Sequence, residues 1–179
     1  DTILEKHMRL DGRTALITGG TQGVGGAIAH ALAAAGCDVV LHGLRDDATA
    51  QQTLEHCRQL GVRAELVLCD LAGPTEQAVA ELVRQVEGIT DQISLLVNNA
   101  GTFAEEPFLQ MSYESFERTL RLNVAAGFFL TQCYARRWVE RGVAGRVLFT
   151  GSINGDLAET NHAAYDTSKG AVRAMVRSL

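Results

Sequence analysis

The chain has 179 residues, of which 46% are hydrophobic and 21% are charged, a balance typical of one soluble globular domain. Its 16 Lys and Arg against 21 Asp and Glu give a net charge of −5. This charge argues against a nucleic-acid or anionic-membrane partner, because both need a basic face. No uninterrupted apolar run approaches the roughly eighteen residues of a membrane helix.

Neither the cysteines nor the histidines indicate a metal site. The four cysteines, Cys37, Cys57, Cys69 and Cys133, are widely separated, and no two form a Cys-x-x-Cys pair. The five histidines show no His-Glu-x-x-His spacing. We therefore expect buried or half-buried reduced thiols, a cytoplasmic location and no bound metal.

The first ten residues interleave acidic and basic side chains and contain no apolar signal-peptide core. We predict a polar N-terminal extension over residues 1–10 and one domain over residues 11–179. That domain begins with residues 14–18, a short apolar run that predicts a buried strand.

A glycine-rich stretch follows this strand and leads into an alanine-rich helix predicted over residues 27–35. Its glycines include Gly19, Gly23 and Gly25, a Gly-x-x-x-Gly-x-Gly spacing rather than Gly-x-Gly-x-x-Gly. Strand, glycine turn and helix together present backbone N–H groups and a helix N-terminus to a phosphate. We therefore favour nucleotide binding over a turn that serves only close helix–strand packing.

The second strand, predicted over residues 38–42, precedes a loop that bears on cofactor choice. An acidic residue at this strand end binds a ribose 2′-hydroxyl, whereas a nearby arginine suits a 2′-phosphate. Gly43 follows the strand and Arg45 comes soon after, which favours NADP, while Asp46 and Asp47 keep NAD as the alternative. The competing interpretation of Arg45 is an ordinary solvated loop residue.

The alternation of strands and helices continues along the chain. We predict helices over residues 48–60 and 74–86, and strands over residues 64–69, 93–97 and 147–150. This order implies right-handed crossovers and an α/β Rossmann-type fold, a doubly wound parallel sheet with helices on both faces. Ligands bind beyond the carboxyl ends of such strands. Five residues of interest lie at those ends: Gly19, Arg45, Asp70, Asn98 and Ser152.

Residues 112–141 form one long predicted helical segment, whose middle is apolar nearly all round except for Asn123. Such a helix is covered on more than one side. We favour cover by the sheet and a second subunit over intrachain core alone. Asn123 in that setting must have hydrogen-bond partners, or it costs stability.

Tyr165 and Lys169 stand four residues apart, so they share one face of a helix. The predicted core face of this helix consists of apolar residues at helical spacing: Ala164, Ala171, Val172, Met175, Val176 and Leu179. A lysine ammonium beside a phenol lowers the pKa of the phenol, because a nearby positive charge favours the phenolate. Tyr165 is therefore a candidate general acid or base.

Together these features resemble the short-chain dehydrogenase/reductase family from about Leu10 onward. Thr18-Gly19-x-x-x-Gly23-x-Gly25 resembles the cofactor turn of that family, and Asn98-Asn99-Ala100-Gly101 resembles its fourth-strand motif. Asp70 resembles the acidic residue beside the adenine. The resemblance implies a larger set of cofactor-binding residues: Gly19, Thr21, Gln22, Gly23, Val24, Gly25, Arg45, Asp70, Leu71, Asn98, Ala100, Gly101, Tyr165 and Lys169. The implied catalytic tetrad is Asn123, Ser152, Tyr165 and Lys169.

The family's mechanism implies a role for each residue of that tetrad. Tyr165 would exchange a proton with the substrate oxygen as the nicotinamide gives or takes a hydride. Lys169 would lower the pKa of Tyr165 and bind the nicotinamide ribose, and Ser152 would hold the substrate oxygen. Asn123 would fix a water that links Lys169 to solvent. We interpret His162 as a surface histidine in the first helical turn rather than as a substrate contact.

The resemblance implies an NAD(P)-dependent oxidoreductase that interconverts a secondary alcohol and a ketone, with a small-molecule carbonyl or alcohol as substrate. A 3-oxoacyl-thioester reductase and a sugar or polyol dehydrogenase fit equally well. A nucleotide-binding sensor or scaffold without turnover is the alternative from another class. The glycine spacing disfavours an epimerase or dehydratase, which prefers Gly-x-x-Gly-x-x-Gly. We also expect a homodimer or homotetramer formed through the helices over residues 112–141 and 162–179.

The family continues past the Tyr165 helix with further strands and a substrate-covering loop, so the resemblance implies a C-terminally incomplete fold. We expect the fifth strand to lie as an open sheet edge. We also expect a fragment of a longer protein, with poor activity and solubility on its own. An intact mass near 19.2 kDa together with full turnover would contradict that expectation.

Overall fold

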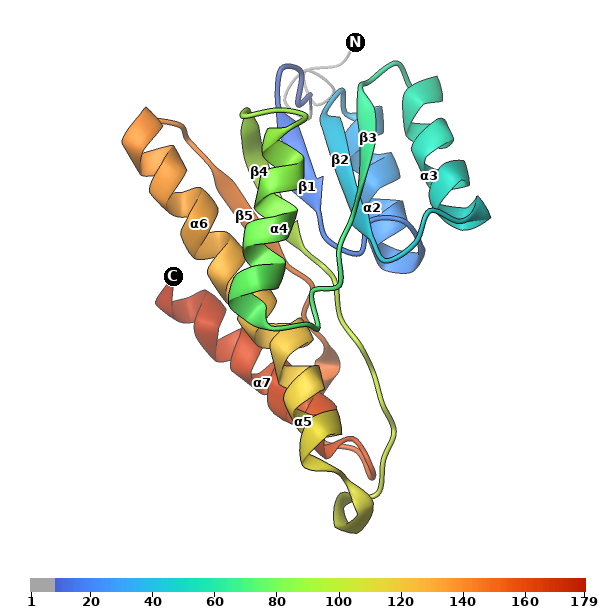
Figure 1. The fold of residues 1–179 in the computed structure, drawn as a ribbon, viewed down its shortest axis with the longest axis vertical. Coiled ribbons are helices and arrows are strands. Elements are labelled where there is room, and N and C mark those ends of the chain that lie inside the picture. The colour runs from blue at the N-terminus through green and yellow to red at the C-terminus, as the bar shows by residue number, and fades with distance from the viewer. Residues whose placement is uncertain (1–8) are drawn as a thin grey trace.

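Five parallel strands form one sheet in the order β3-β2-β1-β4-β5 (Figure 1). The computed structural model describes residues 9–179. The strands are β1 (Thr14–Ile17), β2 (Asp38–Gly43), β3 (Ala64–Leu68), β4 (Ile93–Asn98) and β5 (Arg146–Phe149). All of these pairings are parallel, so the carboxyl ends of the strands lie along one edge of the sheet. The predicted parallel sheet is confirmed.

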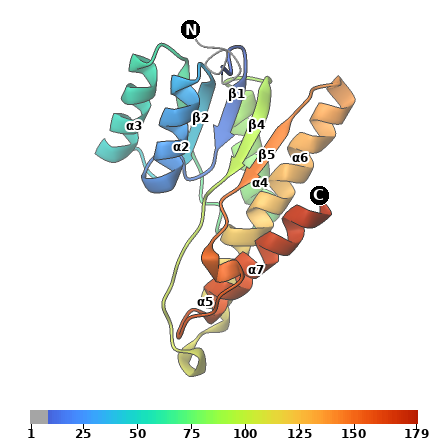
Figure 2. The same ribbon diagram turned by 180° about the vertical axis from the view of Figure 1, so that it is seen from behind.

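Helices cover both faces of the sheet, as predicted. Their bounds are α2 (Gly23–Ala34), α3 (Ala48–Gln59), α4 (Thr75–Glu87) and α6 (Ala126–Arg141). One core lies under α2 and α3, and a second core lies under α4 and α6 (Figures 1 and 2). β1 contributes to both, with Ala15 and Ile17 in the first core and Leu16 in the second, because successive side chains of a strand point to opposite faces.

The long helical segment predicted over residues 112–141 contains a π-helical turn. α5 (Tyr113–Leu120) continues into the π turn η2 (Arg121–Ala125), which continues into α6. α7 (Ala163–Ser178) packs against α5 and η2, and in both views α5 and α7 extend beyond the carboxyl edge of the sheet. Single π turns within α-helices are frequent at functional sites, and this one carries Asn123.

The structure corrects two predictions about helices. α2 begins at Gly23 rather than at residue 27, because the second half of the glycine stretch is itself the first turn of the helix. On α7, Val176 and Leu179 are 50% and 67% exposed, although their spacing placed them on the core face. Apolar periodicity identifies a face of a helix but does not show how far along that face another element packs. The other predicted boundaries agree with the structure to within one residue.

β5 is an edge strand that pairs with β4, and its Leu148 is exposed, which confirms the predicted open edge. Within residues 9–179, no helix combines the length and the apolar character needed to cross a membrane. The same residues contain no group of three His, Cys, Asp or Glu side chains placed to hold a metal ion. Residues 1–8 of the predicted N-terminal extension lie outside the described residues, whereas Leu10 packs against the α2/α3 core.

Candidate active site

A groove of about 340 Å³ lies at the carboxyl edge of the sheet, where the ends of β1 to β4 meet the start of α2. Most of the residues predicted to bind a cofactor line it: Gly19, Thr21, Gln22, Gly23, Val24, Gly25, Asp70, Leu71, Ala100 and Gly101. Further lining residues were not assigned to a cofactor from the sequence: His42, Gly43, Leu44, Asn99, Arg118 and Leu122. The groove thus occupies the position at which open parallel sheets bind ligands.

The glycines of the turn are required for two different reasons. Gly19 and Gly23 have φ angles of +61° and +54°, in the left-handed region that glycine adopts without strain. Gly25 is required by a close approach, because a Cβ there would lie 2.0 Å from the Gly19 carbonyl oxygen and 2.5 Å from Asn99 Nδ2. The spacing therefore encodes two backbone bends and one contact between α2 and the turn.

The start of α2 offers backbone N–H groups to a ligand. Gln22 precedes the helix in an extended conformation, and no side chain within residues 9–179 caps this end by a hydrogen bond. The first N–H groups of a helix lack intrahelical partners, and the helix dipole favours an anion beside them. Because Gly23 and Gly25 of this first turn line the groove, the helix N-terminus fits a pyrophosphate.

Asn99 holds the glycine turn against the neighbouring strands. Its side-chain nitrogen donates to the carbonyl oxygens of Thr18 and Gly19, both at 3.1 Å, and its Oδ1 accepts from the Thr150 hydroxyl at 3.0 Å. Asn98, the predicted cofactor residue of this pair, lies outside the groove, where it is buried and donates to the Thr131 hydroxyl at 3.0 Å. The geometry therefore points to Asn99 rather than Asn98 at the cofactor groove.

His42 connects the glycine turn to the end of β3. Its Nδ1 accepts from the Gly19 N–H at 3.2 Å, and its Nε2 donates to the Cys69 carbonyl oxygen at 2.9 Å. The bond from Gly19 requires the neutral ring, because a protonated Nδ1 cannot accept, and burial lowers the pKa of His42, which favours that form. His42 was not predicted as a site residue, because its only sequence signal is a lone histidine at the end of an apolar strand.

Two charged side chains face each other across the groove. Arg118 of α5 lies with its Nη2 3.7 Å from Asp70 Oδ2, and Asp70 Oδ1 accepts from the Ala72 N–H at 2.9 Å. Arg118 was not predicted, because α5 and the end of β3 are far apart in the sequence. Arg45, in contrast, is an exposed loop residue that does not line the groove.

Tyr165 and Lys169 lie on α7 as predicted, with Lys169 Nζ 5.7 Å from the centre of the Tyr165 ring. The lysine is only 8% exposed and donates to the Thr150 carbonyl oxygen at 2.9 Å, just beyond β5. Burial lowers the pKa of Lys169. Phe103 packs edge-on against Tyr165, with ring centres 5.0 Å apart. The structure thus brings the predicted Tyr–Lys pair to the same sheet edge as the groove.

Asn123 links the π turn to α7, and all of its polar atoms are used. Its Nδ2 donates to the Thr102 carbonyl oxygen and to Ser168 Oγ, both at 2.9 Å, while its Oδ1 accepts from the Thr102 N–H at 2.8 Å. The expectation of hydrogen-bond partners for this buried side chain is confirmed. A cavity of about 10 Å³ is lined by Asn123, Thr150 and Lys169, among other residues, and has room for about one water molecule.

Ser152 begins the short 3₁₀ turn η3 (Ile153–Gly155), and its hydroxyl is turned toward Asn154. Ser152 Oγ accepts from the Asn154 N–H at 3.1 Å and donates to Asn154 Oδ1 at 3.2 Å. Asn154 Nδ2 in turn donates to Asp166 Oδ1 at 2.8 Å, which ties this turn to α7.

His162 is not the surface histidine of the sequence interpretation. Its side chain is 13% exposed, and its ring packs edge-on against Phe103. It precedes α7 rather than lying within its first turn, because the helix begins at Ala163.

Comparison with known proteins gives one consistent result. A family model described as short chain dehydrogenase matches residues 13–179. The chain is 32% identical to the L-rhamnose 1-dehydrogenase (NADP(+)) of Thermoplasma acidophilum, over 94% of this chain and 65% of that protein. It is 34% identical to the 7alpha-hydroxysteroid dehydrogenase of Escherichia coli strain K12, over 97% of this chain and 66% of that protein.

Among solved structures, the 3-oxoacyl (acyl-carrier-protein) reductase of Agrobacterium tumefaciens C58 with NADP bound matches with a TM-score of 0.88 at 30% identity. The match covers 98% of this chain and 66% of that chain. The chain therefore spans just under two thirds of the length of these relatives.

Proposed function

Because the chain belongs to the short-chain dehydrogenase family, we propose that it carries the cofactor and proton-transfer sites of an NAD(P)-dependent oxidoreductase. The reaction interconverts a secondary alcohol and a ketone by hydride transfer. One observation carries this proposal: the buried Lys169 ammonium lies beside the Tyr165 ring at the same edge as the glycine-lined groove. That placement supports a proton-transfer role for Tyr165 beside a groove that suits a dinucleotide.

The residues of the site divide the chemistry among them. Bound NADPH would supply the hydride for reduction, and bound NADP+ would accept it for oxidation. The Tyr165 hydroxyl gives a proton to the carbonyl oxygen during reduction and accepts the alcohol proton in the reverse direction. The Lys169 ammonium stabilises the phenolate that remains after the proton leaves, because an adjacent positive charge favours the ionised phenol. Ser152 orients the substrate oxygen once its hydroxyl leaves Asn154.

Asn123 serves a proton path from Lys169. The cavity that it lines together with Lys169 and Thr150 has room for about one water, which would carry protons between the ammonium and solvent. The three hydrogen bonds of the Asn123 side chain to Thr102 and Ser168 keep the π turn fixed against α7. These bonds hold the Asn123 side chain in one orientation, so the cavity beside Lys169 keeps its shape.

NADP is the favoured cofactor. Asp47 caps α3 by accepting from the Ala50 N–H at 3.0 Å, and Asp46 accepts from Gln51. Both acidic residues of the loop thus have local partners, whereas Arg45 is exposed near the groove and forms no ion pair with a described residue. NADP in the names of the rhamnose dehydrogenase and of the crystallised reductase supports the same choice.

Two substrate classes weighed from the sequence, a sugar or polyol and a 3-oxoacyl thioester, each have a relative that supports them, and the steroid dehydrogenase adds a third class. We propose a homodimer or homotetramer through the helices over residues 112–141 and 162–179, since Phe128 and Phe129 on α6 are exposed. A reducing cytoplasm suits the four free cysteines.

The proposed function is tested by Tyr165→Phe, assayed by nicotinamide absorbance on a panel of ketones and alcohols with both cofactors. We expect turnover to fall about a hundredfold or more while NADP affinity is retained, because only the proton-transfer group is lost. Tyr113→Phe, at an exposed position on α5, is the matched control and should leave turnover unchanged. Unchanged turnover in Tyr165→Phe would remove this residue from the mechanism.

A further inference from the structure

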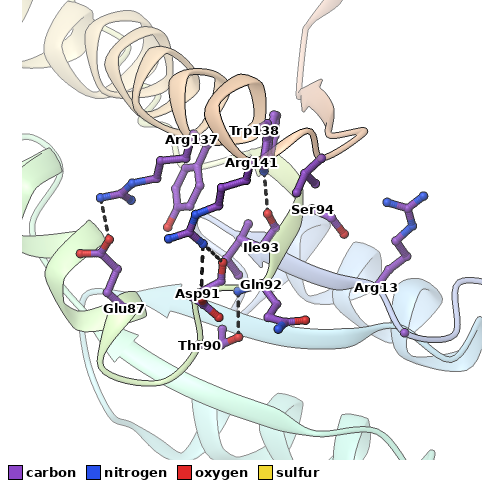
Figure 3. A pocket seen from close by; sticks show the side chains of 13 residues that line it. Arg13, Glu87, Thr90, Asp91, Gln92, Ile93, Ser94, Arg137, Trp138 and Arg141 are labelled. Atoms are coloured by element: carbon purple, nitrogen blue, oxygen red, sulfur yellow. Dashed lines mark hydrogen bonds and ion pairs between the residues drawn. The ribbon is translucent and has the colours of Figure 1, made fainter.

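A second cavity, of about 400 Å³, lies at the amino edge of the sheet, opposite the glycine turn. Figure 3 shows the side chains that line it. It lies between residues 90–94, where β4 begins, and the C-terminal half of α6, with Arg13 before β1 and Glu87 at the end of α4 also lining it. None of its lining residues belongs to the cofactor groove or to the Tyr165 site. No role in the proposed reaction accounts for it.

Two residues that line this cavity carry a buried hydroxyl group without a partner among the described residues. Tyr134 and Ser94 are 4% and 6% exposed, and neither hydroxyl makes a hydrogen bond to any residue within 9–179. Buried polar groups are nearly always hydrogen-bonded, and one that is not lowers stability. The adjacent Trp138 follows the rule, since its indole N–H donates to the Ile93 carbonyl oxygen at 2.6 Å. The two hydroxyls therefore need a partner from outside the described residues, which is either water or a ligand.

An irregularity in the sheet places Ser94 at this cavity. Thr14 of β1 pairs with Ile93 and Ala15 pairs with Leu95, so that Ser94 is skipped in the register between the strands. Such bulges redirect a side chain and are over-represented next to binding sites. Ser94 therefore lines the cavity instead of packing into the regular strand pattern.

The charges around the cavity favour an anion of low charge. Arg137 pairs with Glu87 at 2.6 Å, and Arg141 pairs with Asp91 at 3.3 Å. Arg13 also lines the cavity and donates to a backbone carbonyl oxygen at 3.2 Å, without an ion pair to a described residue. One positive charge is thus in excess. Because exposed ion pairs contribute little, these guanidinium groups remain available to a ligand.

The apolar wall of the cavity and its hydroxyl groups indicate the chemical class of the ligand. Trp138 and Ile93 give the cavity an apolar wall. Burial raises the pKa of Tyr134, so its hydroxyl stays protonated and can donate to a carboxylate oxygen. We propose that this cavity binds a small organic carboxylate, whose oxygens accept from the Tyr134 and Ser94 hydroxyls and whose apolar body lies against Trp138.

The test uses the protein saturated with NADP and titrated with cyclohexanecarboxylate. Trp138 is the one tryptophan in these 179 residues, so its fluorescence reports on this cavity. We expect a saturable change with a Kd of about 1 mM or lower, and about tenfold weaker binding of the neutral cyclohexanecarboxamide. A change without saturation, or equal affinity for the acid and the amide, would overturn the proposal.

Two variants separate a ligand site from a structural defect. Tyr134→Phe removes an unpartnered hydroxyl and should leave the unfolding midpoint unchanged or higher, while it weakens the carboxylate about fivefold or more. Arg13→Gln should also weaken the carboxylate, whereas Arg136→Gln, at an exposed arginine outside the cavity, should not. Unchanged affinity in Tyr134→Phe, or a crystal with the acid that shows only water at both hydroxyls, would refute the site. The readout needs no turnover, so it is independent of the proposed oxidoreductase activity.

Discussion

Gly25→Ala tests whether the third glycine of the turn is required by contact rather than by backbone conformation. The added Cβ would lie 2.0 Å from the Gly19 carbonyl oxygen and 2.5 Å from Asn99 Nδ2, whereas real Cβ atoms stay beyond 3.0 Å. Both neighbours are fixed, the first as backbone and the second by two hydrogen bonds of its amide nitrogen. The clash therefore cannot be relieved by rotation of one side chain.

The size of the effect follows from three contributions. Forcing a methyl group into a packed position costs about 1–3 kcal/mol. Displacing Asn99 loses two hydrogen bonds of about 1 kcal/mol each. Alanine in place of glycine within a helix returns about 0.5–1 kcal/mol. We therefore expect Gly25→Ala to lower the free energy of unfolding by about 3 kcal/mol.

Gly26→Ala is the matched control, one residue further along the same helix. A Cβ at Gly26 would meet its nearest atoms, those of Thr53, at 3.6 Å, which is ordinary contact. This variant should gain about 0.5–1 kcal/mol from the helix preference of alanine. The two variants differ in position but not in chemistry, so the comparison isolates the contact between α2 and the turn.

Urea unfolding of both variants without cofactor measures these free energies, and an NADP titration measures the effect on the groove. We expect Gly25→Ala to weaken NADP about tenfold or more, since the displaced turn lines the groove. If Gly25→Ala and Gly26→Ala unfold within about 0.5 kcal/mol of each other, the contact argument is wrong.

Two further predictions concern the cofactor groove. Arg45→Ala should weaken NADPH about tenfold and leave NADH almost unchanged, as measured by two cofactor titrations; equal effects would retract the preference for NADP. Burial lowers the pKa of His42 below its ordinary value of 6.5, so the unfolded state binds a proton that the folded state does not. The contribution of neutral His42 to the free energy of unfolding should therefore be complete above about pH 6.5 and should decrease as the pH falls below it. His42→Gln should show a smaller acid loss in urea titrations across that range, and an identical loss would refute a neutral, bonded His42.

Much of the fold followed from local patterns. Short apolar runs alternate with helical stretches, and that order alone implies parallel strands with helices on both faces. The predicted start of α2 was wrong because a run of glycines carries no helix signal of its own, although α2 begins at Gly23 and its Gly25 lies against Gly19 and Asn99. Val176 and Leu179 at the end of α7 were predicted to be buried but are exposed. Apolar periodicity shows which face of a helix is packed, but it does not show at which residue the packed element ends.

The site was predictable where its residues lie within one strand–turn–helix unit. The glycine turn and the Tyr165–Lys169 pair are of this kind, because their spacing of a few residues fixes their geometry. Asn98 was predicted to bind the cofactor, but Asn99 lines the groove. The sequence does not show which of two adjacent asparagines at the end of a strand faces the groove. The bond of Asn99 to Gly19 joins residues 80 positions apart.

The sequence by itself determined the order of the elements, the parallel sheet, the glycine turn and the helix that carries Tyr165 and Lys169. Only the tertiary structure decided that His42 supports the turn, that Arg118 faces Asp70 across the groove, and that Ser94 and Tyr134 share a cavity. The physical reason is the range of the interactions. Periodicity and capping act within a few residues, whereas these contacts depend on strand register and on helix packing between segments far apart in the chain.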